Sequence, residues 1–339
     1  MLKWFSVTPA QRPLPSVLMS ALFVLTFCCV LSLLLGAGGL APHASLLTLL
    51  GHGSADAEFT VFHLRLTRTL VGLFVGLTLG IAGALMQAVA RNPLAEPGLL
   101  GVSAGSSFAV AMALVLGAST ATLTVGIAQI GALVGCLCVI GTAKMQGQRN
   151  DPIRLVLAGA ALSSLLLAMT SLILLFDQRA ADEIRFWVTG SVAGRDTSTL
   201  ISVLPSMLLA LICILYTAKP LASLALGERV AIGLGHKPRR IRGIVIIAVA
   251  LLVGAATAIA GPVAFIGLVV PFAARALVGP DIRRTLWLCL PLGPIIVITA
   301  DIISRLVAQP AEMPLGVLTA IVGAPVLLFI VRSHRLPTL

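Results

Sequence analysis

Three arginines beside two long apolar segments could bind carboxylate groups. Arg65 and Arg68 stand just before the charge-free segment 69–90, and Arg305 ends the apolar segment 285–306. A guanidinium group forms strong charge-assisted hydrogen bonds with carboxylates, often two at once. These arginines could therefore hold carboxylates of an arriving protein. They could equally extend from the apolar segments toward a polar surface, and both interpretations stay open.

Asp301 is the one carboxylate of the segment 285–306 and precedes Arg305 by four residues. Residues four positions apart share a helix face, so a local ion pair is the simpler explanation for this aspartate. A carboxylate inside a membrane is otherwise a functional candidate. A relay for protons would need more such charges, so the sequence gives little support to a proton-driven transporter.

The residue pattern offers little for catalysis or metal binding. Gly101-Val-Ser-Ala-Gly105 matches the nucleophile motif of hydrolases, but no strand precedes it and no base is placed to activate the serine. The chain has no phosphate-binding Gly-x4-Gly-Lys-Ser/Thr loop, so ATP is not bound in that way. The five histidines show no ligand pair, and the six cysteines fall in apolar segments as small buried residues do. We predict no metal and no cofactor.

The composition indicates a membrane protein. Hydrophobic residues make up 58% of the 339 residues and charged residues only 10%, against about 25% charged in soluble domains. The apolar segments approach the roughly 20 residues that a spanning helix needs and are too continuous for a β-barrel. We predict an all-α polytopic membrane protein with ten transmembrane helices. These are 16–36, 68–89, 97–117, 119–143, 153–176, 199–218, 241–260, 262–279, 285–306 and 313–331.

The basic residues orient these helices. With both termini in the cytoplasm, 17 of the 23 Lys and Arg residues lie inside, which accounts for the net charge of +11 without a nucleic-acid partner. The first apolar segment is longer than a cleavable signal sequence, so we expect an uncleaved span in the bacterial inner (plasma) membrane. The longest cytoplasmic segment, 219–242, is too short to fold alone, so residues 1–339 form one membrane domain.

Glycine and proline mark close contacts and breaks. Gly72, Gly76 and Gly80 line one helix face, which lets a neighbouring helix approach closely. The prolines of 91–98 predict a tight connection, and the paired apolar segments break near Gly117 and Gly261. In 219–242, a short helical stretch over 221–226 is followed by a break at 227–229 and a second stretch over 230–234. This segment either docks onto a cytoplasmic partner or serves only as a positive anchor.

Nine short segments, in order and spacing, resemble the iron-chelate and cobalamin uptake permeases of ABC importers. The longest begins Arg91-Asn-Pro-Leu-Ala-Glu-Pro-Gly98, and two positions depart from the usual pattern, with Thr67 in place of proline and Phe272 in place of histidine. The matching segments are 64–68, 83–87, 91–105, 157–159, 187–191, 226–228, 259–271, 300–301 with Arg305, and 312–325.

The resemblance implies a permease subunit with no enzymatic activity of its own. It implies a second permease subunit (an identical copy or a paralogue), a cytoplasmic ATPase dimer below, and a periplasmic binding protein above. The expected cargo is a ferric siderophore, and cobalamin and haem are the alternative cargoes. An ion-coupled secondary transporter is the alternative function with less support.

The resemblance also assigns residues to these partners. Arg65, Arg68 and Arg305 resemble the arginines that meet glutamates of the binding protein. The coupling to the ATPase and the translocation path are expected at the following residues: Leu221, Leu226, Gly227, Glu228, Arg229, Leu234 and Gly235 for coupling, and Ala158, Gly159, Ser163 and Ser164 for the path.

Overall fold

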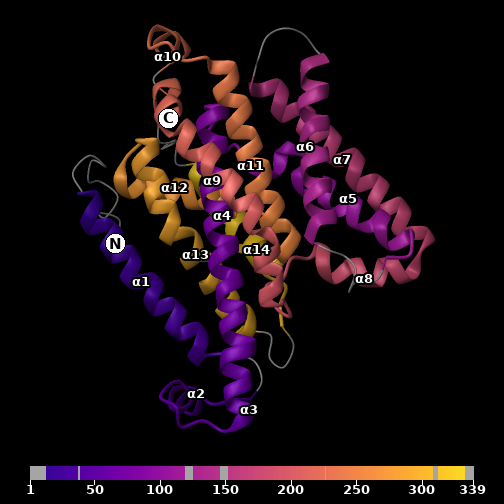
Figure 1. The fold of residues 1–339 in the computed structure, drawn as a ribbon, viewed down its shortest axis with the longest axis vertical. Helices are drawn as coiled ribbons and strands as arrows, with labels where there is room; N and C mark the ends of the chain where they lie inside the picture. The colour runs from indigo at the N-terminus through magenta and orange to yellow at the C-terminus, as the bar shows by residue number, and fades with distance from the viewer. Residues whose placement is uncertain are drawn as a thin grey trace.

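A computed structural model describes residues 13–36, 39–118, 125–145, 152–225, 227–307 and 312–332. The described chain is helical (Figure 1). The elements are α1 (Leu14–Leu34), α2 (Pro42–Leu49), α3 (Ala55–Glu58), a π-helical turn (Phe59–Arg65), α4 (Leu66–Ala90), a 3-10 turn (Pro97–Leu100), α5 (Val102–Val115), α6 (Val125–Met145), α7 (Pro152–Phe176), α8 (Gln178–Val188), α9 (Thr197–Ala225), α10 (Glu228–Gly233), α11 (Pro238–Ala260), α12 (Ile266–Val278), α13 (Ile282–Val307) and α14 (Leu315–Arg332).

Ten of these helices coincide with the ten predicted spans. Within the described residues, seven are long and apolar enough to cross a membrane, and α5, α12 and α14 are shorter apolar helices. The regular elements of the described residues are all helices, which confirms the all-α prediction. Lipid offers no hydrogen-bond partners to the backbone, and a helix satisfies its backbone groups internally. The predicted breaks are present too, because Gly117 and Gly261 take left-handed φ angles of 93° and 73°. The terminal residues 1–12 and 333–339 lie outside the described residues, so their cytoplasmic placement stays a prediction.

The second span begins earlier than predicted. We expected it to start at residue 68, but α3, the π-helical turn and α4 form one helix of 36 residues, Ala55–Ala90. At 1.5 Å per residue this helix is about 54 Å long, well beyond a hydrocarbon core of about 30 Å. The apolar pattern identifies only the charge-free part of this helix, so the first third, which carries Asp56, Glu58 and Arg65, was missed.

Two predicted segments differ in detail. The predicted span 97–117 is divided at Gly101 (φ 72°), where the 3-10 turn ends and α5 begins. The stretch 221–226, predicted as a separate short helix, is the last turn of α9, which continues through Pro220. Long helices inside a membrane protein tolerate proline because neighbouring groups replace the lost hydrogen bond. Leu226 itself lies outside the described residues.

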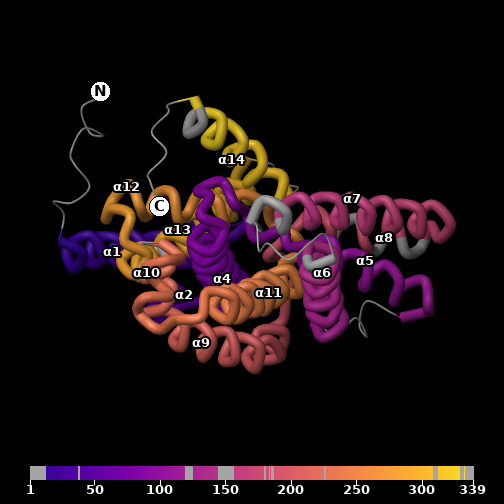
Figure 2. The backbone as a smooth tube through the Cα atoms, turned by 90° about the horizontal axis from the view of Figure 1, so that it is seen from above, coloured from indigo at the N-terminus to yellow at the C-terminus, as the bar shows by residue number. Residues whose placement is uncertain are grey.

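Helices α4 and α11 form the centre of the molecule. In an apolar 18-residue stretch of each helix, 72% of the residues are buried in Ala55–Ala90 and 83% in α11. The corresponding share is 11% in both α7 and α9. Viewed along the bundle, α4 lies between α11, α12 and α13, while α1, α7 and α14 lie at the periphery (Figure 2). The outer helices therefore present most of their side chains to lipid or to another subunit.

Glycines bring α4 into backbone contact with two neighbours. A Cβ atom on Gly76 would lie 2.5 Å from the carbonyl carbon of Gly293 in α13. One on Gly83 would lie 1.8 Å from the carbonyl oxygen of Gly267 in α12. The glycine face predicted for this helix is thus confirmed and extends one turn further.

We predict that Gly83→Ala destabilises the protein by about 1–3 kcal/mol, because the added methyl group overlaps the α12 backbone. The matched control is Gly141→Ala on α6, where a Cβ atom would meet nothing within 4 Å. Alanine there should be neutral or stabilising by about 0.5–1 kcal/mol, because it favours the helix. Thermal unfolding in detergent measures both. Equal effects at the two positions would show that the contact with α12 carries no special weight.

Candidate functional site

The two ends of the molecule carry different features. Helices α2 and α3 lie at one end and α10 at the opposite end (Figure 1). We call these the α3 end and the α10 end. The long helix Ala55–Ala90 connects them.

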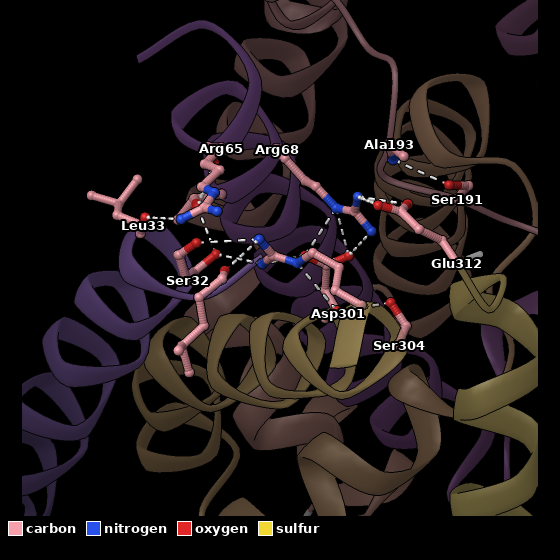
Figure 3. A network of polar contacts seen from close by, with 12 residues as sticks. Ser32, Leu33, Arg65, Arg68, Ser191, Ala193, Asp301, Ser304 and Glu312 are labelled. Carbon is pink, nitrogen blue, oxygen red and sulfur yellow. Dashed lines mark hydrogen bonds and ion pairs between the residues drawn. The ribbon is translucent and has the colours of Figure 1, made fainter. Parts of the chain in front are cut away.

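A network of charges lies at the α3 end, centred on Asp301 of α13 (Figure 3). Its Oδ1 lies 2.7 Å from Nη2 of Arg68, and its Oδ2 lies 2.7 Å from Nη2 of Arg305. The side chain of Asp301 is only 3% exposed. The predicted ion pair between residues 301 and 305 is therefore confirmed, and the structure adds Arg68, which is 233 residues away in sequence.

Arg68 extends the network toward the surface through Glu312. Its Nη1 donates to both carboxylate oxygens of Glu312, at 2.8 and 2.7 Å. The Arg68 side chain is 12% exposed and that of Glu312 is 31% exposed. Glu312 is thus the member of this network that solvent or a partner reaches most easily.

Arg65 binds backbone groups at the end of α1. Its Nη1 donates to the carbonyl oxygens of Leu33 and Leu34 at 3.0 and 2.9 Å and to the hydroxyl of Ser45 at 2.9 Å. The last carbonyls of a helix have no partner within the helix and carry partial negative charge, so a cation stabilises them. Arg65 joins α1, α2 and the long helix, and it is buried.

Arg305 binds the same helix end from the other side. It donates to the carbonyl oxygen of Leu35 at 3.1 Å and to the hydroxyl of Ser32 at 2.7 Å. The two guanidinium groups leave no room beside Gly36, where a Cβ atom would lie 2.9 Å from Nε of Arg65 and 3.2 Å from Nη1 of Arg305. Sequence reasoning missed Gly36. Nothing in its neighbourhood along the chain marks it, because its neighbours in space come from residues 65 and 305.

The structure therefore brings together the three arginines predicted to meet a binding protein. Arg65 and Arg305 are 3% and 1% exposed and use their donors within the chain, so Arg68 is the most accessible of the three.

Several segments of the recognised pattern meet where α11 ends. The amide of Ser191 donates to the carbonyl oxygen of Ala260 at 2.7 Å. A Cβ atom on Gly261 would lie 2.0 Å from the carbonyl oxygen of Trp187, and one on Gly316 would lie 2.3 Å from that of Thr189. We call this meeting of 187–191, 260–262 and 316 the motif crossing.

A half-buried carboxylate stabilises the chain just beyond the motif crossing. Oε1 of Glu96 accepts a hydrogen bond from the amide of Phe265 at 2.9 Å, and Phe265 has a left-handed φ of 68°. Non-helical backbone within a membrane protein must be buried and hydrogen-bonded. Sequence reasoning predicted a turn at 91–98 but not this bond, which joins residues 169 positions apart.

The α10 end presents an apolar surface. Val230, Ile232 and Leu234 are 44%, 58% and 62% exposed on or directly after the short helix α10. Flanking glycines shape this segment, because Gly227 and Gly235 take φ angles of 136° and 79°. Exposed apolar side chains gathered on a short polar-flanked segment are typical of a protein contact.

The other predicted coupling residues support this segment. Leu221 is buried in the core rather than exposed. Glu228 pairs with Arg242 at 3.2 Å, and Arg229 is exposed. Arg91, at the end of the long helix, donates to the carbonyl oxygen of Leu224 in the last turn of α9.

The predicted path residues of α7 divide between two faces. Ala158 and Gly159 are buried, and a Cβ atom on Gly159 would lie 1.7 Å from the carbonyl oxygen of Leu99. Ser163 is half-buried, whereas Ser164 is exposed and donates its hydroxyl to the carbonyl oxygen of Ala160 at 2.9 Å. Two of the four residues therefore pack inward.

The described residues contain no group of three or more His, Cys, Asp and Glu side chains that could hold a metal ion.

We predict that Asp301→Asn lowers the stability by about 3–5 kcal/mol, because two arginines lose their buried counter-charge. Glu312→Gln provides a control in the same network and should cost less than about 1 kcal/mol, since Glu312 is 31% exposed. Thermal unfolding in detergent compares the two variants. Similar losses would mean that Asp301 is not the centre of the network.

Comparison with known proteins shows which family this chain resembles. The model of the FecCD transport family matches residues 24–333. The chain is 44% identical over 313 residues to the ferric enterobactin transport system permease protein FepD of Escherichia coli, covering 92% of this chain and 93% of that one. It is 35% identical over 315 residues to the Fe(3+)-citrate import system permease protein YfmD of Bacillus subtilis, covering 93% and 94%.

A solved structure agrees in fold. A metal-chelate type ABC transporter in an inward-facing conformation superposes with a TM-score of 0.80 at 29% identity, covering 96% of this chain and 100% of that one. The extent of the family match and the identity to these relatives decide the assignment. The chain belongs to the FecCD transport family and is a multi-pass membrane permease of a bacterial ABC importer.

Proposed function

We propose that this permease carries a ferric siderophore from the periplasm to the cytoplasm. The observation that supports this most is the 44% identity, over nearly the whole chain, to a permease named for ferric enterobactin. The Fe(3+)-citrate relative at 35% identity carries another iron chelate by name. Cobalamin and haem are the alternative cargoes, because the family that the sequence resembles also includes permeases for them.

An ion-coupled mechanism has less support in the described residues. The intramembrane carboxylate that it would use, Asp301, already forms ion pairs with Arg68 and Arg305. Both of its oxygens lie 2.7 Å from a guanidinium group, so this carboxylate serves as a counter-charge within the chain rather than as an open site for a coupling ion. The importer is instead powered by ATP hydrolysis in a partner subunit.

We infer that the ATPase dimer binds the α10 end. The exposed apolar side chains of Val230, Ile232 and Leu234 supply the contact surface, together with Arg229. Leu221 anchors the segment in the core, and Gly227 and Gly235 allow its turns. The ion pair of Glu228 with Arg242 fixes α10 against α11.

We infer that a periplasmic binding protein docks at the α3 end. Arg68 is the arginine with a donor near the surface, where a carboxylate of the partner can reach it. Arg65 and Arg305 act indirectly, by fixing the end of α1 around the site.

We further infer that a second permease subunit, identical or a paralogue, covers α7 and that the path runs between the two subunits. The exposed face with Ser164 suits this role, with Ser163 beside it, while Ala158 and Gly159 allow α7 to pack closely onto the 3-10 turn. Small and hydroxyl side chains let a bulky chelate pass without holding it. The whole chain acts as one membrane domain with cytoplasmic termini.

We predict that cells expressing this permease with its ATPase and binding protein take up radioactive ferric enterobactin. Uptake should cease when the ATPase is inactivated, because the permease has no energy source of its own. Transport of labelled cobalamin or haem in place of the siderophore would correct the cargo. Uptake that continues without ATPase activity would contradict the importer mechanism.

We predict that Leu234→Asp weakens ATPase binding by about tenfold, which corresponds to about 1.4 kcal/mol, because a carboxylate replaces an exposed apolar contact. Leu234→Met keeps the apolar volume and should bind normally. Co-purification of the ATPase with each variant measures the difference. Normal binding by both variants would place the ATPase elsewhere.

A further inference from the structure

The charge network at the α3 end does not balance. It contains the guanidinium groups of Arg65, Arg68 and Arg305 but only the carboxylates of Asp301 and Glu312. Arg65 is bound by carbonyl oxygens and a hydroxyl, which lower the cost of burying its charge without neutralising it. Among these groups one positive charge remains, so the network as a whole attracts a further carboxylate.

The two carboxylates bound to Arg68 differ in how firmly they are held. Asp301 is buried and is shared with Arg305. Glu312 is 31% exposed and meets only the outer Nη1 of Arg68 among the contacts described for it. A solvent-exposed ion pair is weak and exchangeable, whereas a buried one is costly to break.

We propose that Glu312 is an internal substitute for the carboxylate of the docking protein. It occupies Nη1 of Arg68 while the α3 end is free, and an incoming carboxylate displaces it. This inference rests on the proposed docking of a binding protein at this end and adds a regulatory step to it.

The exchange would reach the interior through the segment that follows Glu312. That segment is held by long hydrogen bonds, from the amide of Met313 to the carbonyl oxygen of Ser304 at 3.3 Å and from the amide of Gly316 to that of Gly190 at 3.3 Å. Gly316 belongs to the motif crossing and to the first turn of α14. Release of Glu312 therefore loosens the start of α14 at the moment of docking.

The test compares binding-protein affinity for the intact transporter in nanodiscs, with either native permease or Glu312→Gln. Glutamine keeps the shape but removes the competing charge, so the variant should bind the siderophore-loaded binding protein about two- to fivefold more tightly, the range expected for an exposed ion pair. The matched control is Glu58→Gln on α3, an exposed glutamate outside the network, which should leave the affinity unchanged.

The outcomes separate the two proposals. Unchanged or weaker binding by Glu312→Gln, or equal tightening by both variants, overturns the substitute. If the native transporter binds no binding protein at all, the proposed docking fails and the substitute fails with it.

A second readout uses the native chain and does not depend on a variant. Docking should speed hydrogen exchange of the backbone amides in 312–318, because the Glu312 anchor is released. Slower or unchanged exchange in this segment on docking would overturn the release step.

Discussion

The close backbone approach of α4 to α12 and α13 is the constraint on which the rest of the molecule depends. Apolar side chains contact lipid as favourably as they contact another helix, so the hydrophobic effect does not drive helices together in a membrane. Helix association therefore relies on tight packing. The contacts at Gly76 and Gly83 provide it, and a side chain at either position would push the helices apart. With α4 fixed in the centre, Arg68 at its start and Arg91 at its end reach opposite ends of the protein.

The charge network depends on that placement. Asp301 pairs with Arg305 on its own helix, and it reaches Arg68 as well only because α4 and α13 pack in contact. Arg65 and Arg305 then stabilise the end of α1 by binding its free carbonyl groups. The Arg68 side chain is therefore held by the packing of α4 and by its ion pairs with two carboxylates. The Glu312 side chain is held by its contact with Arg68. The same cluster thus contains a rigid part and an exchangeable part.

The sequence predicted what depends on local composition. The apolar segments, the breaks at Gly117 and Gly261 and the ion pair between residues 301 and 305 all follow from the chain within a few turns. Contacts between distant segments could not be predicted in this way. The bond from Phe265 to Glu96 and the need for glycine at position 36 arise only when those segments meet in space. Burial of Arg65 was missed for the same reason, because its partners are backbone carbonyl groups and the hydroxyl of Ser45, which lie 20 to 32 residues away along the chain.

The outward hydroxyl of Ser164 bears on how such a transporter is put together. Because it donates to the carbonyl oxygen of Ala160 in its own helix, it needs no hydrogen-bond acceptor from a neighbouring chain. A newly inserted copy can therefore rest in the bilayer without leaving the Ser164 hydroxyl unsatisfied. At this position, the proposed second subunit does not have to be present before the chain enters the membrane.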